Sequence, residues 1–520
     1  MMNLTQLLHR NVQQNASREA ISFEGQSWTY AELHQRVARM AGALRNLGVK
    51  DGERVALMSL NSSRYIEYLM AVPWANGVVN PVNTRWSAAE TVYSLKDSGT
   101  RILMIDKAFA PLLPEIKAQA EFLEHIIYAD DGDTPEGAHN YETLLKQAQP
   151  IEDACRGGDD LAGIFYTGGT TGFPKGVMLS HSNFMTSAIS LALAAETPDA
   201  PRYMHAAPMF HIADMATVLM TFLRGGTQVV VRAFDPDTVQ ATVRDQHVTD
   251  ALLVPTMVQM LLDSPNFDAA NFSSWQRMIY GASPMPSATL DRMIESLPLV
   301  KLYQAYGMTE LAPLATVNPP ENHTAEARES GLIRSAGRSG VLQDVRIVDE
   351  NRQECPRGQV GEITVRGPNV MQGYWGKPEQ TAQAIVDGWM HTGDGGYMDE
   401  NGFVFVVDRV KDMIISGGEN IYSAEVESVV SQHPQVSQCA VIGIPSEQWG
   451  EAVHVVIVPA SENFSLTVEA LRDFCRAHIA GYKCPQSIST LEALPLSGAG
   501  KILKTELRKP YWEGHDKGVA

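Results

Sequence analysis

The chain has 520 residues, a formal net charge of −19 at pH 7 and 44% hydrophobic residues. This length allows about three domains, or two of which one is large, and the hydrophobic content argues against wholesale disorder. Nucleic acids and anionic membranes attract basic surfaces, so the acidic balance disfavours general binding to either of them. An anionic substrate must therefore be held by local groups.

Three features predict a soluble protein of the reducing cytoplasm without an integral membrane segment. No apolar run approaches the ~18 residues that a membrane-spanning helix needs. Residues 1–20 contain neither the apolar core nor the cleavage site of a signal peptide. The five cysteines are scattered without a CxxC pair, so neither a disulfide framework nor a zinc site is predicted.

Helix and strand patterns alternate up to about residue 335. Thr29 and Glu32 form a capping box before apolar residues at helical spacing, which predicts a helix that ends at Gly48. A buried strand is predicted at residues 55–60, and short apolar runs follow at 102–105, 163–166, 228–231, 251–254, 277–280 and 300–303. Such alternation predicts an α/β fold in which helices cover parallel sheets.

The pattern changes in the last third of the chain. Residues 337–376 are glycine-rich with short alternating strands, which is typical of a small antiparallel β unit. After Lys411 the order helix, strand, strand, helix, strand predicts a compact α+β domain of about 110 residues. We therefore predict a large N-terminal domain of stacked α/β sheets plus the β unit at residues 1–409, and a small mobile C-terminal domain at residues 410–520.

The strongest chemical signal is the segment YTGGTTGFPKG, residues 166–176, which follows a predicted strand. Glycines let backbone N–H groups approach an anion, threonine hydroxyls add donors, and Lys175 supplies a charge for phosphate. It is not a Walker A loop, because Lys175 is preceded by Pro174 and followed by Gly176. We predict a phosphate-binding loop rather than a flexible surface turn.

Four further segments are each ambiguous when taken alone. YGMTE, residues 306–310, suits a site where phosphate meets Mg²⁺, but a helix cap explains it equally well. Asp394 in WMHTGD could accept ribose hydroxyls or form an Asx turn. The remaining segments are DRVKDMIISGGENIY at 408–422 and PLSGAGK at 495–501. The last displays Lys501 after small residues, where it could reach another domain's cleft or stay solvated.

In this order and at these separations, the five segments resemble those of adenylate-forming enzymes. That superfamily includes acyl- and aryl-CoA synthetases, firefly luciferases and the adenylation domains of peptide synthetases. The resemblance covers residues 10–510. It departs at Gly168, where many relatives carry serine, so one hydroxyl contact to phosphate is lost while the backbone N–H remains. We expect a modest effect on ATP affinity rather than loss of activity.

The resemblance implies a role for each matching residue. The ATP phosphates would be held by Thr167, Gly168, Gly169, Thr170, Thr171, Gly172 and Lys175. Other nucleotide contacts would come from Gly281, Ala282, Ser283, Tyr306, Gly307, Asp394 and Arg409, the last two with the ribose. The catalytic group would comprise Lys501 for adenylation, Thr309 at the α-phosphate, Glu310 as the Mg²⁺ ligand, and His211 as the gate of the acyl pocket. Lys411 matches the hinge, and Gly417 and Gly418 border the CoA tunnel.

The implied reaction is ATP- and Mg²⁺-dependent activation of a carboxylic acid, with coenzyme A as cosubstrate. The carboxylate attacks the α-phosphate to give an acyl-adenylate and pyrophosphate, and the CoA thiol then displaces AMP. Lys501 and Mg²⁺ on Glu310 would offset the repulsion between carboxylate and triphosphate. Rotation at Lys411 would exchange the two faces of the C-terminal domain between half-reactions.

An AMP-forming acid–CoA ligase is the favoured function, and a carrier-protein or peptide-synthetase-type adenylation enzyme is the alternative. Amino-acid-activating members carry Asp where this chain has His211, although Asp214 lies three residues on. A non-catalytic relative or a luciferase-like oxidase is the third interpretation. We expect a small-molecule acid, ATP and CoA as partners and no nucleic acid; homodimerisation stays open.

The expected acyl pocket is mostly apolar and contains no Lys or Arg. Its residues are His211, Ile212, Met215, Gly281, Ala282, Ser283, Gly307, Met308, Leu311 and Ala312. Such a lining disfavours dicarboxylates. It favours a medium- to long-chain fatty acid or an aryl acid such as a hydroxycinnamate, and does not decide between them.

Overall fold

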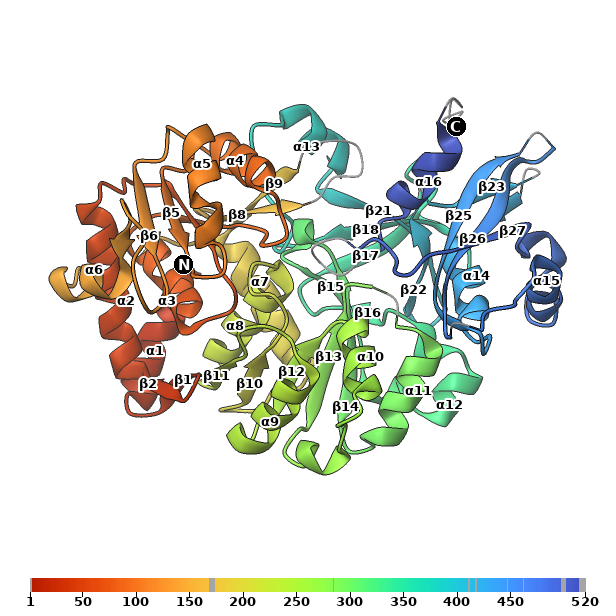
Figure 1. Cartoon of the computed structure of the whole chain (residues 1–520), viewed down its shortest axis with the longest axis horizontal. Helices are drawn as coiled ribbons and strands as arrows, with labels where there is room; N and C mark the ends of the chain where they lie inside the picture. Colours follow the sequence, from red (N-terminus) through yellow and green to blue (C-terminus); the bar gives the residue numbers. More distant parts are fainter. Residues whose placement is uncertain are drawn as a thin grey trace.

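The computed structural model describes residues 2–167, 174–283, 285–409, 412–416, 419–446, 448–461, 463–496 and 502–513. Four sheets organise this part of the chain, two large and two small. The two large sheets and one small sheet form the N-terminal domain, and the fourth sheet forms a smaller C-terminal domain at one end of the molecule (Figure 1). The predicted α/β fold class is confirmed.

The first large sheet has eight strands in the order β19-β9-β8-β4-β3-β5-β6-β7. All neighbours from β8 to β7 are parallel, whereas β9 and β19 run antiparallel at one edge. Its strands are β3 (Arg54–Met58), β4 (Val78–Pro81), β5 (Ile102–Ile105), β6 (His125–Tyr128), β7 (His139–Asn140), β8 (Leu161–Thr167), β9 (Lys175–Ser180) and β19 (Gly373–Tyr374).

The second large sheet has nine strands in the order β16-β15-β14-β13-β12-β10-β11-β1-β2. Its centre, from β14 to β1, is parallel as predicted, and antiparallel strands close both edges. Its strands are β1 (Glu19–Phe23), β2 (Gln26–Thr29), β10 (Arg202–His205), β11 (Thr227–Val230), β12 (Asp250–Leu253), β13 (Arg277–Gly281), β14 (Lys301–Gly307), β15 (Leu314–Asn318) and β16 (Arg338–Ser339).

Helices cover both large sheets. They are α1 (Gln6–Asn15), α2 (Tyr30–Asn46), α3 (Ser63–Trp74), α4 (Ala88–Asp97), α5 (Leu113–Gln119), α6 (Tyr141–Gln147), α7 (His181–Ala194), α8 (Ile212–Leu223), α9 (Pro236–Gln246), α10 (Pro255–Asp263), α11 (Ser287–Ser296), α12 (Ala325–Glu329) and α13 (Pro378–Ala384). Helix α2 begins with the predicted capping box of Thr29 and Glu32. The largest apolar core contains Phe165 and Val230, one from each large sheet, together with Phe184 and Leu219 of α7 and α8. One continuous core therefore joins the two sheets.

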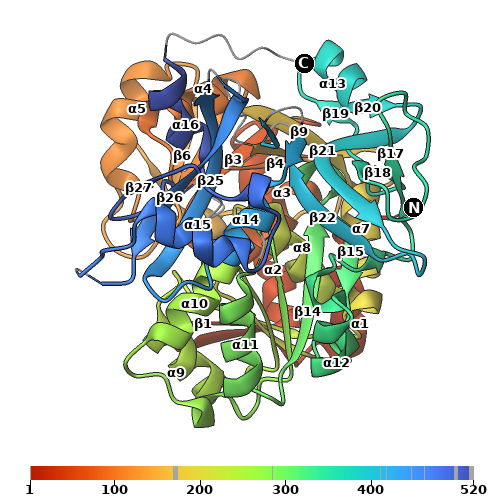
Figure 2. The same ribbon diagram turned by 90° about the vertical axis from the view of Figure 1, so that its right-hand side faces the viewer.

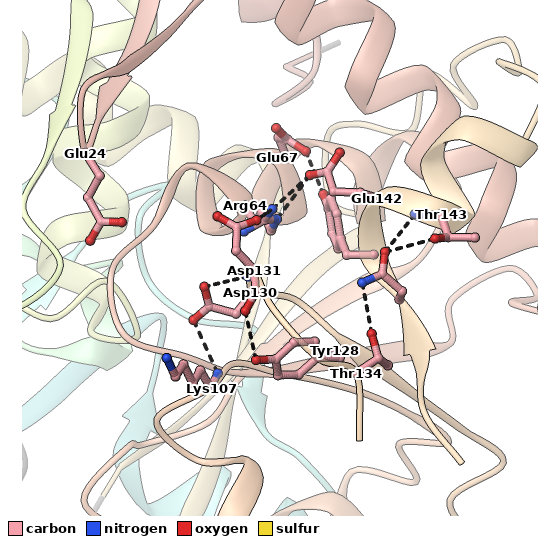
Figure 3. Close-up of polar contacts among 12 residues, drawn as sticks. Glu24, Arg64, Glu67, Lys107, Tyr128, Asp130, Asp131, Thr134, Glu142 and Thr143 are labelled. Carbon is pink, nitrogen blue, oxygen red and sulfur yellow. Dashed lines mark hydrogen bonds and ion pairs between the residues drawn. The ribbon is translucent and has the colours of Figure 1, made fainter. Parts of the chain in front are cut away.

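Ion pairs fasten helices α2, α3 and α6 to one another. Arg36 of α2 contacts the fully buried carboxylate of Glu67 at 2.6 Å and also reaches Glu142 of α6. Arg64 of α3 bonds to Glu142 and to Asp131, the latter at 2.7 Å (Figure 3). Because the buried charges are paired and hydrogen-bonded, we assign this network a structural role.

The third sheet is antiparallel, in the order β17-β18-β21, and both β20 and β22 pair with the edge of β21 that faces away from β18. The β unit predicted at residues 337–376 contributes only β17 and β18 to this sheet, because β16 and β19 join the large sheets and the other three strands follow residue 376. The strands are β17 (Asp344–Val348), β18 (Gly361–Arg366), β20 (Ile385–Val386), β21 (Trp389–Met398) and β22 (Val404–Arg409). It lies between the large sheets and the C-terminal domain (Figure 1, Figure 2).

The C-terminal domain has a five-stranded sheet with its own apolar core. Its elements are β23 (Ile414–Ser416), β24 (Glu419–Ile421), α14 (Ser423–Val430), β25 (Val436–Ser446), β26 (Gly450–Pro459), α15 (Val468–Arg476), β27 (Ser487–Thr490) and α16 (Lys504–Trp512). The predicted order from α14 to β27 is present. Strand β23 matches the apolar run MIIS, residues 413–416, which the sequence predicts as a strand just after the domain boundary. Strand β24 and helix α16 are additions, and α16 packs Leu507 against Ile442 and Val456 of the sheet.

Candidate active site

The threonine- and glycine-rich segment connects two antiparallel strands. Thr167 of β8 pairs with Lys175 of β9, and Tyr166 pairs with Gly176. The hairpin therefore brings two predicted phosphate contacts, Thr167 and Lys175, opposite each other at its tip. The predicted contacts between them lie outside the described residues; they are Gly168, Gly169, Thr170, Thr171 and Gly172.

The loop end of this hairpin is tied to the end of helix α4. The Tyr166 hydroxyl donates to Asp97 Oδ2 at 2.7 Å, and burial together with this carboxylate raises the pKa of Tyr166. From the other flank, the Trp375 backbone N–H donates to the carbonyl oxygen of Gly176, and its indole Nε1–H donates to the carbonyl oxygen of Asp97 at 2.9 Å. Asp97 thus holds the hairpin directly at Tyr166 and through Trp375 at Gly176.

Glu310 and Lys175 meet at a tyrosine that the sequence did not single out. Glu310 lies in the short helix η3 (Thr309–Leu311) directly after Met308, and it is 6% exposed. Tyr374 donates its hydroxyl hydrogen to Glu310 Oε1 at 2.9 Å, and Lys175 Nζ lies 4.8 Å from the centre of the Tyr374 ring. Strand β19 fixes this tyrosine, because Tyr374 pairs with Val177 of β9.

The predicted ribose-binding residues are also brought together. Asp394 of β21 and Arg409 of β22 are cross-strand partners, and the Tyr306 hydroxyl donates to Asp394 Oδ2 at 2.7 Å. Tyr306 lies in β14, in the same YGMTE segment as Glu310. The two motifs are 88 residues apart in sequence and adjacent in the structure.

The segment Gly281–Ser283 lies beside the YGMTE segment. Gly281 pairs with Ala305 of β14, and a Cβ at Gly281 would collide with the Ala305 carbonyl oxygen, so the close approach of these strands requires glycine. Ala282 has a φ of +67°, a conformation that costs free energy for any residue other than glycine and is typical of functional sites. Gly307 ends β14 opposite Leu314.

Most of the predicted acyl-pocket residues belong to the packed core. Met215, Leu311 and Ala312 have no exposed surface, Ile212 is buried, and Met308 packs partly buried against the same cluster. His211 precedes α8, and its ring lies 4.1 Å from that of Phe210 between ring centres.

Asp214, which kept the amino-acid-activating alternative open, is buried in the core. Its carboxylate accepts from His205 Nδ1 at 3.1 Å, and His205 Nε2 lies 2.6 Å from Gln228 Oε1. The carboxylate thus already has a partner in the core.

Several predicted residues lie outside the described part of the chain: Lys411, Gly417, Gly418 and Lys501. Their flanking residues are described. Asp412 forms an ion pair with Arg508 at 2.8 Å, and Ser416 pairs with Glu419 on either side of the two glycines. Leu496 and Ile502 form an antiparallel bridge on either side of the segment that carries Lys501.

Among the residues that the structure describes, no group of three or more His, Cys, Asp or Glu side chains is placed to hold a metal ion. None of the helices described is long and apolar enough to cross a membrane.

A large α/β domain, a smaller α+β domain, and a hairpin with Thr167 and Lys175 beside a buried carboxylate define an adenylate-forming enzyme. The family model "AMP-binding enzyme" matches residues 8–375, and the model "AMP-binding enzyme C-terminal domain" matches residues 425–501. The chain belongs to the AMP-binding enzyme family.

Three known proteins illustrate the range of relatives. A feruloyl-CoA synthase of Amycolatopsis sp. is 39% identical over 504 residues, which cover 96% of this chain and 98% of the relative. The fatty acid–[acyl-carrier-protein] ligase ScoC of Streptomyces coeruleorubidus is 35% identical, with 98% and 97% covered. The crystal structure of ATP-bound MatB from Rhodopseudomonas palustris superposes with a TM-score of 0.88 at 29% identity, covering 99% of this chain and 100% of MatB.

Proposed function

We propose that this protein is an ATP-dependent, AMP-forming acyl-CoA synthetase that activates an apolar carboxylic acid. The observation that carries the proposal is the meeting of Lys175 and Glu310 at Tyr374, next to the Tyr306–Asp394 pair. A cation for phosphate, a carboxylate for a metal ion, and a carboxylate for ribose are then available in one site. ATP and CoA are abundant in the cytoplasm, where we propose that it acts.

The described residues fit ATP and Mg²⁺. Lys175 and Thr167 lie at the hairpin tip, where phosphate oxygens would be bound, and Asp394 with Arg409 would hold the ribose. Glu310 is a nearly buried carboxylate that Tyr374 orients through a hydrogen bond to Oε1. Mg²⁺ binds carboxylate and phosphate oxygens, so Glu310 would be its ligand, and the ion would neutralise phosphate charge when bound.

The chain's own groups then act on the reacting carboxylate in two stages. A substrate carboxylate attacks the α-phosphate beside Thr309, and pyrophosphate leaves. Lys501 would be presented by the C-terminal domain, beginning at residue 410, to stabilise the charge that develops there. Rotation about Lys411 would replace it with the Gly417–Gly418 face, which admits the thiol that displaces AMP.

The acyl acceptor distinguishes the two leading interpretations. CoA is favoured by the similarity to a feruloyl-CoA synthase, whereas the similarity to the fatty acid–[acyl-carrier-protein] ligase ScoC supports a carrier protein. The amino-acid-activating form of the alternative loses support, since Asp214 is bound to His205 in the core. The decisive assay supplies each acid with ATP and either CoA or phosphopantetheinylated carrier protein, and measures AMP release.

A panel of carboxylic acids, each assayed for AMP release, identifies the substrate. Ferulate, cinnamate, octanoate, laurate, palmitate, acetate and malonate span the relevant sizes and charges. Each buried CH₂ contributes about 0.8 kcal/mol, so kcat/KM for fatty acids should rise roughly fourfold per methylene until the pocket is filled. A preference for ferulate over fatty acids of similar size would indicate an aryl pocket. Failure of every acid to give AMP would overturn the proposed function, and preference for acetate or malonate would overturn the apolar pocket.

A further inference from the structure

Strand β21 contains a bulge at the residues that carry Asp394. Across the ladder with β18, Glu362 pairs with Gly395 and Thr364 pairs with His391. Between these two pairs, β18 has one residue, Ile363, whereas β21 has three, Thr392, Gly393 and Asp394, so β21 bulges there by two extra residues. Gly393 has a φ of +71°, which glycine adopts without strain and other residues rarely adopt.

Bulged residues lose their regular ladder partners, and side chains supply the missing ones here. Glu362 Oε1 accepts a hydrogen bond from the Gly393 backbone N–H at 2.9 Å, while Oε2 lies 2.7 Å from His391 Nδ1. The Thr392 hydroxyl donates to the Ile363 carbonyl at 2.7 Å and accepts from the Asp394 N–H at 3.1 Å. One carboxylate thus holds the bulge at two points, immediately before Asp394.

The bulge determines where the Asp394 side chain lies. The Asp394 carboxylate accepts a hydrogen bond from the Tyr306 hydroxyl at 2.7 Å, and the Asp394 backbone pairs with Arg409. The Glu362 side chain is 27% exposed and that of His391 is 12% exposed, so the two contacts are largely shielded from competing water. Loss of both would leave the bulge held only at Thr392 and Asp394 and would loosen the backbone at Gly393, while Tyr306 and the large sheets stay in place.

We propose that Glu362 is a positioning residue for nucleotide binding, whose carboxylate holds the bulge in the conformation in which Asp394 reaches the ribose hydroxyls. The inference rests on the proposed function, because it takes Asp394 as the ribose contact. It makes a specific claim: Glu362 affects the part of the affinity that comes from the ribose hydroxyls and leaves the rest unchanged.

The test compares the Kd values of ATP and 2′,3′-dideoxy-ATP by calorimetry in the full-length protein. In the wild type, the Kd of dideoxy-ATP divided by the Kd of ATP measures the contribution of the ribose hydroxyls. Glu362→Ala should reduce this ratio about tenfold while the Kd of dideoxy-ATP changes less than about twofold, since a hydrogen bond to a charged group is lost at one site only. Asp394→Ala should bring the ratio close to one. Adding Glu362→Ala to that variant should leave the ratio unchanged.

Matched variants separate positioning from general damage. Glu362→Gln keeps an oxygen for the Gly393 N–H and should retain part of the ratio. Glu362→Met keeps the volume without acceptors and should also reduce the ratio about tenfold, so it replaces the alanine variant if that variant does not fold. Glu350→Ala removes an exposed carboxylate of the same β unit and should match the wild type.

An unchanged ratio in Glu362→Ala, or in Glu362→Met where the alanine variant does not fold, would overturn the inference. Equal weakening of ATP and dideoxy-ATP binding in the variant would also overturn it. Equal affinity of the wild type for the two nucleotides would do the same. Failure of the proposed function is a separate result: no acid would support ATP–pyrophosphate exchange, while the ribose dependence on Glu362 would persist.

Discussion

Tyr374 donates its hydroxyl hydrogen to the carboxylate of Glu310 at 2.9 Å, across 64 residues of sequence. Its ring lies beside the Lys175 ammonium group, which suits a cation–π contact. This tyrosine thus links the hairpin proposed to bind phosphate to the carboxylate proposed to bind Mg²⁺.

Tyr374→Phe should raise the Mg²⁺ concentration that gives half-maximal ATP–pyrophosphate exchange by about tenfold, because Glu310 loses the hydrogen bond that orients it. The ring remains, so the Lys175 contact should persist and the KM for ATP at saturating Mg²⁺ should change little. Tyr374→Leu removes both contacts and should raise both quantities. Wild-type Mg²⁺ dependence in Tyr374→Phe would contradict this role.

Asp97→Ala should raise the KM for ATP by roughly five- to tenfold without changing the KM for the acid, because the hairpin loses the anchor of its Tyr166 flank. Asp97→Asn retains an acceptor oxygen and should have a smaller effect. Combining Asp97→Ala with Tyr166→Phe should be no worse than either change alone, since both remove the same bond. Lys96→Ala, at an exposed neighbour on α4, is the control. Additive losses in the double variant would refute a shared role.

Lys501→Ala should slow acyl-adenylate formation by on the order of 10²-fold, as expected for loss of an electrostatic group at the reacting phosphate. Conversion of preformed acyl-AMP to the thioester by CoA should continue at the wild-type rate. Rapid-quench measurement of each half-reaction separates the two effects. An equal loss in both half-reactions would show that the lysine has another role.

His323 should make the free energy of unfolding depend on pH. Burial lowers its pKa to about 4; the ring nitrogens lie 2.9 Å from the Pro319 carbonyl oxygen and from the Tyr280 hydroxyl. The unfolded chain, with a histidine pKa of about 6.5, binds the proton more readily, so this contribution is complete above pH 6.5 and is lost as the pH falls towards 4.

Urea titrations at several pH values test this expectation. Relative to His323→Gln, the wild type should lose about 1.4 kcal/mol of unfolding free energy per pH unit between 6.5 and 4. The comparison cancels the carboxylates that titrate in both proteins. Parallel pH profiles for the two proteins would disprove the assignment.

Local sequence patterns were sufficient for the framework of the fold. The capping box at Thr29 and the apolar run in β3 each act within one element, where periodicity and hydrogen bonding are local. The short strand β24 was not predicted, because a three-residue strand without an apolar run carries little periodic signal.

The candidate site was predicted through its motifs, and its supporting residues were not. Asp97, Glu362 and Tyr374 act on groups 69, 29 and 64 residues away, and no spacing rule connects such pairs. Only the strand order places β19 beside β9, and thereby Tyr374 beside Lys175. Burial was equally unpredictable: the full enclosure of Met215 and Leu311 depends on packing between elements.

The bulge of β21 also restricts how this segment can vary in length. Successive side chains of a strand point to opposite faces, and the two extra residues opposite Ile363 keep this alternation in phase on both sides of the bulge. Deleting a single residue between His391 and Gly395 would reverse the faces of one half of the strand, turning Met398 from the core to solvent or Trp389 away from Arg346. Evolution can therefore lengthen or shorten this segment only in steps of two residues, unless a compensating change occurs in β18 or β22.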